Sequence, residues 1–218
     1  MATRKKKADE VSTVPEVREE EVRGDATSEV PKVTKYLLDP QMYPEEIAYW
    51  EKYFSKLPEN ARIVEWGSGG STTMFLDLMK DGQQLVSIEH NDEWYGKVSE
   101  AVKKHPRFKQ LTYIKVNIDK NLTEIDFYRY GSPYEENPTF IDSYIAPLQA
   151  RPDLFNADVM FVDGIARGAI LATIRVKANP KAEVFIHDYV DRETWYEWAV
   201  SLFWKRETIA GTLLKLTI

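Results

Sequence analysis

From about residue 62 onward the chain alternates short apolar runs with longer stretches of helical periodicity. Each run is rich in Val, Ile, Phe and Leu, which is typical of strands that are buried on both faces. The runs are residues 62–66, 85–89, 111–116, 158–163 and 183–188. Helical stretches follow four of them, at about 71–80, 92–104, 166–178 and 194–204. Strands that alternate with helices predict a doubly wound α/β fold with a largely parallel sheet.

The last segment breaks this alternation. Residues 207–210 and 212–218 are both β-prone, and only Gly211 separates them, so a crossover helix does not fit between them. We therefore expect this pair to be antiparallel and to lie at one edge of the sheet.

The amino-terminal part contains a second change of pattern. Residues 1–35 are mostly charged or small and show no apolar pattern, which predicts a flexible charged tail before a folded domain at 36–218. The tail is a candidate anchor for a protein partner. Apolar residues at helical spacing then run from Ile47 to Leu57, after Pro44 in the first turn. This helix is expected to cover the sheet edge or the site.

Composition limits the class of protein. The 218 residues include no cysteine, which excludes disulfides and thiolate metal sites and indicates a reducing, cytoplasmic location. No apolar run reaches membrane-spanning length, and no apolar segment follows the basic amino terminus as in a signal peptide. A formal net charge of −6 disfavours broad nucleic-acid binding. Small molecules or proteins are the expected partners.

The junction between the first strand and its helix reads VEWGSGGSTT. Gly67, Gly69 and Gly70 allow a tight turn and let a ligand approach the backbone, where a helix amino terminus presents unpaired N–H groups. Ser71 or Thr72 can cap that helix. The glycines do not follow the G-x-G-x-x-G spacing of dinucleotide-binding folds, so the match to a nicotinamide site is partial.

Two acidic residues accompany the glycine turn. Glu65 precedes the glycines, and Glu89 ends the second strand, where a carboxylate can bind a ribose diol. In these features the chain resembles the class I S-adenosylmethionine-dependent methyltransferases over about residues 40–218. The resemblance implies a Rossmann-like sheet of seven strands, mostly parallel with an antiparallel last pair. It implies S-adenosylmethionine as cofactor, bound by Glu65, Gly67, Ser68, Gly69, Gly70, Ser71, Thr72, Glu89, His90, Asn117, Ile118 and Asp163. The acid that the family usually has near Asn117 is missing unless Asp119 replaces it.

Two further motifs, FVDGIAR and FIHDYVDR, resemble a group of small methyltransferases, some of which methylate sugar residues of plant cell-wall polysaccharide. Those relatives carry an acid before a glycine or alanine after the fourth strand, and His-Asp-x-x-Arg after the fifth. The resemblance implies O-methylation of a small or sugar-like acceptor. The glycine loop departs from that of the plant enzymes.

Catalytic candidates follow from the strand order. The carboxyl ends of parallel strands meet at one opening, so Asp163, His187 and Asp188 are expected to lie together there. His187 is the candidate general base because its unperturbed pKa lies near neutrality. The alternative is that these side chains only hold neighbouring loops. The two aspartates could also bind a divalent metal, but a third ligand is lacking unless Asp191 supplies it, so a metal is not expected.

Acceptor binding is expected from Arg167 and Arg192, whose guanidinium groups can hold a carboxylate or phosphate. The alternative is a salt bridge to Asp163 or Asp191. The long section before the fourth strand is aromatic, and Tyr130 in it is expected to stack on a sugar or a base, or else to anchor the loop to the core.

Other large aromatic residues are assigned to the core. Trp66 and Tyr113 lie within or beside predicted strands, and Trp94 shares the apolar face of the helix at 92–104. For Trp66, a place in the wall of the cofactor site is the alternative.

Three functions stay open at this point. The first is a methyltransferase that uses S-adenosylmethionine. The second is a non-catalytic protein that keeps the fold as a binding or assembly module. The third is an NAD-dependent oxidoreductase, which the glycine spacing and the antiparallel terminal pair disfavour.

Overall fold

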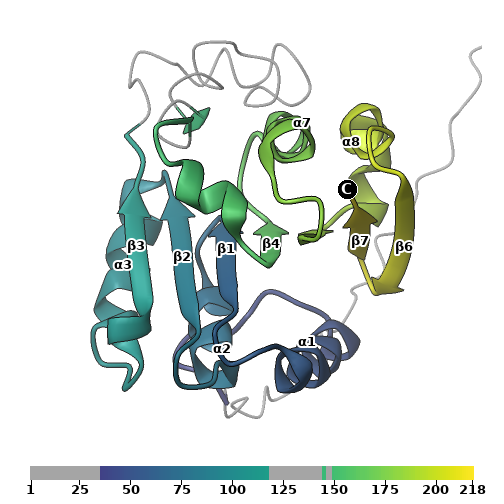
Figure 1. Ribbon diagram of the computed structural model, residues 1–218. Helices are drawn as coiled ribbons and strands as arrows, with labels where there is room; N and C mark the ends of the chain where they lie inside the picture. The colour runs from purple at the N-terminus through teal and green to yellow at the C-terminus, as the bar shows by residue number, and fades with distance from the viewer. Residues whose placement is uncertain (1–34, 118–143, 146–148) are drawn as a thin grey trace, which may run out of the picture. The chain divides into compact units, whose positions relative to one another are not determined.

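A computed structural model describes residues 35–117, 144–145 and 149–218, which fold around a seven-stranded sheet (Figure 1). The strands lie in the order β3-β2-β1-β4-β5-β7-β6. Their bounds are β1 Arg62–Trp66, β2 Gln84–Glu89, β3 Leu111–Lys115, β4 Val159–Val162, β5 Glu183–Ile186, β6 Lys205–Ala210 and β7 Leu213–Thr217. Strands β1 to β5 are parallel, and β7 pairs antiparallel with both β5 and β6. The predicted α/β doubly wound fold with an antiparallel carboxyl-terminal pair is confirmed.

Helices cover both faces of this sheet (Figure 1). The α-helices are α1 Pro44–Lys56, α2 Gly70–Leu78, α3 Asp92–Val102, α7 Arg167–Lys177 and α8 Glu193–Val200. The short 3₁₀ helices are η1 Phe108–Gln110, η2 Pro152–Asn156 and η3 Val190–Arg192. Helices α1, α2 and α3 pack on one face, and α7 and α8 pack on the other. None of these described helices has the length and apolar character needed to span a bilayer.

Strand side chains alternate between the two helical layers. On β4, Met160 and Val162 pack with α7 and α8, whereas Val159 and Phe161 pack with α1, α2 and α3. Trp66 at the end of β1 is fully buried in the layer formed by α7 and α8, as expected for a core residue. Because both faces are covered, the central strands β4 and β5 read VMFV and EVFI and are nearly all apolar, which is why they are recognisable in the sequence.

Helix α1 begins at Pro44, where a proline fits the first turn. Trp50 and Phe54 are fully buried, and the indole of Trp50 contacts the rings of Phe161 and Phe185 in the sheet. The helix therefore covers one face of the sheet at β4 and β5, whereas the sequence predicted that it covers the sheet edge or the site.

The end of α8 and the start of β6 differ from the sequence prediction. The helix ends at Val200, not near Trp204, and β6 begins at Lys205, not at Glu207. Lys205 and Arg206 pair with β7 through their backbones, and their side chains are exposed. A charged sequence does not indicate a strand by itself, but it suits an edge strand because charge discourages further pairing.

Candidate active site

A pocket of about 550 Å³ opens where β1, β2 and β4 end. The predicted site residues that line it are Gly67, Ser68, Gly69, Gly70, Ser71, Glu89, His90, Asp163, Arg167 and Arg192. It is also lined by residues that the motifs did not single out: Gln41, Met42, Asn91, Glu93, Trp94 and Ile165. The glycine loop and the residues after β2 and β4 thus share one cavity.

Two of the loop glycines are required by the backbone around them. Gly67 has φ = +94°, and a Cβ added there would lie 2.4 Å from the amide nitrogen of Gly164. A Cβ added to Gly70 would lie 2.3 Å from the carbonyl oxygen of Asp39. At Gly69 the nearest atom would be 3.4 Å away, which the indole of Trp94 can accommodate. Gly67 and Gly70 therefore permit close contacts within the protein and also line the pocket.

Glu65 lies beneath the glycine loop and is not among the residues that line the pocket. Its buried carboxylate accepts hydrogen bonds from the hydroxyls of Ser71 at 2.5 Å and of Thr72 and Ser87 at 2.6 Å. Helix α2 begins at Gly70, so Ser71 and Thr72 lie in its first turn, and both hydroxyls donate to Glu65. The hydroxyl oxygen of Thr72 also accepts a hydrogen bond from the amide of the N-cap residue Gly69 at 3.0 Å, so Thr72 contributes to the cap. Burial raises the pKa of Glu65 to about 7, although the three hydroxyls oppose this shift.

The raised pKa of Glu65 predicts a pH-dependent stability. The carboxyl titrates near 4.5 in the unfolded chain, so its contribution is full below that pH and is lost as the pH rises through 7. We expect Glu65→Gln to reduce the fall in unfolding free energy between about pH 5 and 8, by up to about 3 kcal/mol. Urea unfolding at both pH values measures this. The exposed Glu100→Gln is the control, and an equal pH dependence in both variants would contradict the prediction.

Glu89 is an ionised acceptor in the pocket wall. Only 3% of its surface is exposed. Its Oε2 accepts hydrogen bonds from the amide and hydroxyl of Ser68, both at 3.0 Å, and its Oε1 accepts from the amides of His90 and Asn91, both at 2.8 Å. Burial alone would raise the pKa of Glu89, but the contacts with His90, Asn91 and Ser68 outweigh it and hold the pKa below its ordinary value.

Two aromatic residues assigned to the core from sequence reach the glycine loop. The hydroxyl of Tyr113 lies 2.6 Å from the hydroxyl of Ser68, and its ring stacks on Tyr95. The indole N–H of Trp94 donates a hydrogen bond to the carbonyl oxygen of Ser68. Tyr113 is partly buried and packs against the core, as expected from the sequence, but its hydroxyl also reaches the glycine loop. The contact of Tyr113 with Ser68 depends on the pairing of β2 with β3, which no local motif encodes.

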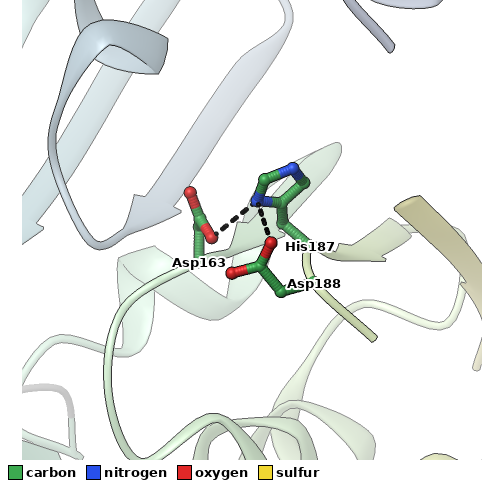
Figure 2. Close-up of side chains that lie close together, drawn as sticks. All are labelled: Asp163, His187 and Asp188. Carbon is green, nitrogen blue, oxygen red and sulfur yellow. Dashed lines mark hydrogen bonds and ion pairs between the residues drawn. The ribbon is translucent and has the colours of Figure 1, made fainter. Parts of the chain in front are cut away.

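Asp163, His187 and Asp188 meet at the ends of β4 and β5, and their side chains point toward one another (Figure 2). Nδ1 of His187 lies 2.9 Å from Oδ1 of Asp163 and 3.5 Å from Oδ1 of Asp188. The two carboxylates are partly exposed, whereas the imidazole is buried. The predicted convergence of the three side chains is therefore present, but of the three only Asp163 lines the pocket.

The second ring nitrogen of His187 contacts Glu46 of α1, with 3.1 Å between Nε2 and Oε2. Only an imidazolium, with two N–H groups, can donate to a carboxylate at each nitrogen. Burial alone would lower the pKa of His187, but the hydrogen bonds with Asp163 and Glu46 outweigh it and raise the pKa to about 10. His187 is therefore protonated at neutral pH, which disfavours the general-base role expected from its unperturbed pKa.

Arg167 is held inside this cluster. Its side chain is 6% exposed, and it donates to the carbonyl oxygens of Gly164 at 2.8 Å, Asp163 at 3.0 Å and His187 at 2.5 Å. Its Nη2 also lies 3.4 Å from a carboxylate oxygen of Asp163 and of Asp188. The salt-bridge alternative thus describes Arg167 better than an open clamp does.

Arg192 differs from Arg167 because it is more exposed. Its guanidinium lies 3.6 Å from Asp188, not against Asp191, and the residue lines the pocket. Arg192 is therefore the more accessible of the two predicted acceptor-binding arginines.

Charge argues against a metal ion at this cluster. Asp163, His187 and Asp188 each offer a ligand atom, and these atoms lie within 4.8 Å of one another. Three cations, the imidazolium and the guanidinium groups of Arg167 and Arg192, already face the carboxylates of Asp163, Asp188 and Glu46. A metal ion would have to replace the proton on Nδ1 and lie beside Arg167, so the donor set does not fit a divalent cation.

The remaining predicted residues are not placed in the pocket. Thr72 is buried under the loop, and Asn117 is exposed after β3 and does not line the cavity. Ile118 and Tyr130 lie outside the described residues, as does the predicted tail up to residue 34.

The chain is similar to known proteins in its three-dimensional structure. No family model and no curated protein matches the chain. A methyltransferase-like protein from Silicibacter pomeroyi matches over 83% of this chain and 88% of its own, with 19% identity and a TM-score of 0.63. A putative O-methyltransferase from Klebsiella pneumoniae matches over 83% of each chain, with 13% identity and a TM-score of 0.51.

A third solved structure contains the cofactor. The O-methyltransferase TomG from Streptomyces achromogenes, in complex with S-adenosylmethionine, matches over 79% of this chain and 78% of its own, with 13% identity and a TM-score of 0.50. At these identities the likeness establishes the fold. The chain has the Rossmann-like fold of the class I S-adenosylmethionine-dependent methyltransferases.

Proposed function

We propose that this protein is a methyltransferase that uses S-adenosylmethionine to methylate an oxygen atom of a small or sugar-like acceptor. The observation that carries the proposal is the ionised Glu89 beside the glycine loop in one pocket. The shared fold of solved methyltransferases supports it. A buried, ionised carboxylate suits the neutral diol of a ribose and would repel a phosphate at that place.

The described residues fit this cofactor. The first turn of α2, which begins at Gly70 in the pocket wall, presents the positive end of the helix dipole to an anionic group, such as the carboxylate of a methionine moiety. The amides of Gly67, Ser68 and Gly69 are already bonded within the protein. Glu89 can accept hydrogen bonds from ribose hydroxyls when the hydroxyl of Ser68 turns away from it. When bound, S-adenosylmethionine supplies an electrophilic methyl group on a sulfonium.

Asp163 is the group that we assign to the acceptor hydroxyl. Its carboxylate is partly exposed and the residue lines the pocket, so it can accept the hydroxyl proton. His187 and Arg167 hold this carboxylate in place, and both of these cations also form ion pairs with Asp188. Arg192 at the pocket can bind polar groups of the acceptor. Alignment of the two reactants supplies the larger part of the rate in such a displacement.

Cofactor binding is tested by calorimetry with Glu89→Gln. This change keeps the shape of the side chain but removes the charge that strengthens hydrogen bonds to a diol, worth about 2 kcal/mol. We expect micromolar binding of S-adenosylmethionine or its demethylated product by the native protein, and binding about 30-fold weaker in Glu89→Gln. Glu100→Gln on α3, an exposed residue, should bind like the native protein.

The same titration separates the alternatives. Binding of NAD in place of S-adenosylmethionine would identify an oxidoreductase site. No binding of the methyl donor or its product would contradict the proposal. If the cofactor binds, transfer of a labelled methyl group to sugars and small hydroxyl compounds tests catalysis, and binding without any transfer would favour the non-catalytic module. Circular dichroism and thermal melting of each variant show whether its fold is kept.

A further inference from the structure

Glu46 is a charged residue that the sequence motifs and the proposed chemistry do not use. It has no exposed surface, and its carboxylate accepts four hydrogen bonds. Oε1 accepts from the amide of Thr212 at 2.7 Å and from its hydroxyl at 3.1 Å. Oε2 accepts from the amide of Tyr43 at 2.9 Å and from Nε2 of His187 at 3.1 Å.

A buried carboxylate of this kind requires a cationic partner, because removing an unpaired charge from water is costly. His187 is the cation that contacts Glu46 in the described structure. Burial by itself would raise the pKa of Glu46, but the bonds from His187 and from the amides of Tyr43 and Thr212 outweigh it and lower the pKa. The pair is therefore a carboxylate and an imidazolium.

The surrounding structure is shaped to hold Glu46 in this position. Gly211, in the turn between β6 and β7, has φ = +49°, and a Cβ added there would lie 2.7 Å from Oε1 of Glu46. The turn thus approaches the carboxylate closely enough for Thr212 to donate both of its hydrogen bonds. Glu46 joins α1, the end of β5 and the last hairpin at one point.

His187 is consequently fixed at both ring nitrogens. The charged groups that face it are Glu46 from α1, Asp163 after β4 and Asp188 after β5, while Arg167 of α7 faces the two aspartates. The bond at Nε2 sets the orientation of the ring, and the orientation of the ring directs the Nδ1–H group at Asp163. Asp163 is the only one of these carboxylates that lines the pocket.

We propose that Glu46 is a positioning residue of the active site, which holds His187 as an imidazolium against Asp163 and so places the Asp163 carboxylate at the pocket. The effect on turnover rests on the proposed function, whereas the effect on His187 does not. A charged residue on the first helix thereby acts on the acceptor side of the site through a histidine 141 positions away.

Nuclear magnetic resonance of the imidazole groups tests the link directly. The chain has three histidines, so their signals can be assigned with single His→Asn variants. In the native protein at neutral pH, both ring nitrogens of His187 should be protonated. Its signals should not titrate between about pH 5.5 and 8.5, around the ordinary histidine pKa. A neutral ring in the native protein would overturn the proposal, and this measurement requires no variant at position 46.

The variant Glu46→Gln removes the charge and keeps the size of the side chain. We expect the pKa of His187 to fall by at least about one unit. Glu51→Gln is the matched control on the same helix, because Glu51 contacts Lys35 and Tyr36, not His187. An unchanged pKa in a folded Glu46→Gln variant would overturn the proposal.

Kinetics distinguish this role from a purely structural one. Once an acceptor is known, Glu46→Gln should lower kcat about tenfold and leave the KM for S-adenosylmethionine within about threefold, since Asp163 acts on the acceptor. An unchanged kcat would overturn the effect on turnover. Failure of the native protein to bind S-adenosylmethionine would contradict the proposed function and leave the histidine measurement valid, so the two failures are distinguishable.

Discussion

Replacing Gly67 with alanine is expected to destabilise the protein by about 3 kcal/mol or more and to abolish cofactor binding. The backbone at Gly67 has φ = +94°, which disfavours any residue with a Cβ. That Cβ would also lie 2.4 Å from the amide nitrogen of Gly164 and 2.5 Å from its Cα. Both are backbone atoms directly after β4, so the clash can be relieved only by moving the ends of β1 and β4 apart.

Gly69→Ala is the matched control for this prediction. Gly69 has an extended backbone, and its new Cβ would make ordinary contact with the indole of Trp94. We expect its unfolding free energy in urea to change by less than about 1 kcal/mol. Equal losses of stability in the two variants would show that the contact between Gly67 and Gly164 is not the cause.

Arg167→Met is expected to lower the unfolding free energy by about 3 to 5 kcal/mol, because it removes one partner from a buried charge cluster. The methionine fills much of the same space but leaves the carbonyl oxygens of Gly164, Asp163 and His187 without this donor. It also removes a positive charge that lies 3.4 Å from two aspartates. Thermal and urea unfolding at neutral pH measure the loss.

One further variant separates charge from hydrogen bonding at Arg167, and a second variant elsewhere in the chain is the control. Arg167→Lys keeps the charge but cannot donate hydrogen bonds in all the directions of a guanidinium. We therefore expect it to lower the unfolding free energy by less than Arg167→Met does. Arg151→Met is the control, because the side chain of Arg151 is 42% exposed and pairs with Asp153, which lies two positions away. Arg151→Met should lower the unfolding free energy by less than about 1 kcal/mol. If Arg167→Met costs no more than this control, the cluster does not depend on the guanidinium.

Much of the fold could be predicted because the local pattern and the tertiary structure agree. The central strands β4 and β5 are nearly all apolar because both of their faces are covered, and Gly211 leaves room only for a hairpin. The boundary between α8 and β6 was harder to predict, because the charged start of β6 is selected by its pairing with β7. Local propensity carries no information about such a partner.

Part of the candidate site was also predictable. Glu89 and the glycines lie at strand ends, where the topology of a parallel sheet places a ligand crevice, and they line the pocket. Glu65 occupies a similar place in the sequence, yet its side chain faces the buried layer under α2 and bonds to three hydroxyls. Which of the two acids is open to a ligand depends on the helix that covers them.

The sequence by itself determined the order of strands and helices, the glycine turn after β1 and the meeting of Asp163, His187 and Asp188 at one edge. These features follow from local periodicity and from the geometry of parallel sheets. Only the tertiary structure decided the charge of His187, because the two ring nitrogens contact Asp163 and Glu46, and packing brings Glu46 to within 3.1 Å from 141 positions away. A side chain's pKa is set by its burial and by the charges around it, and a linear sequence contains neither.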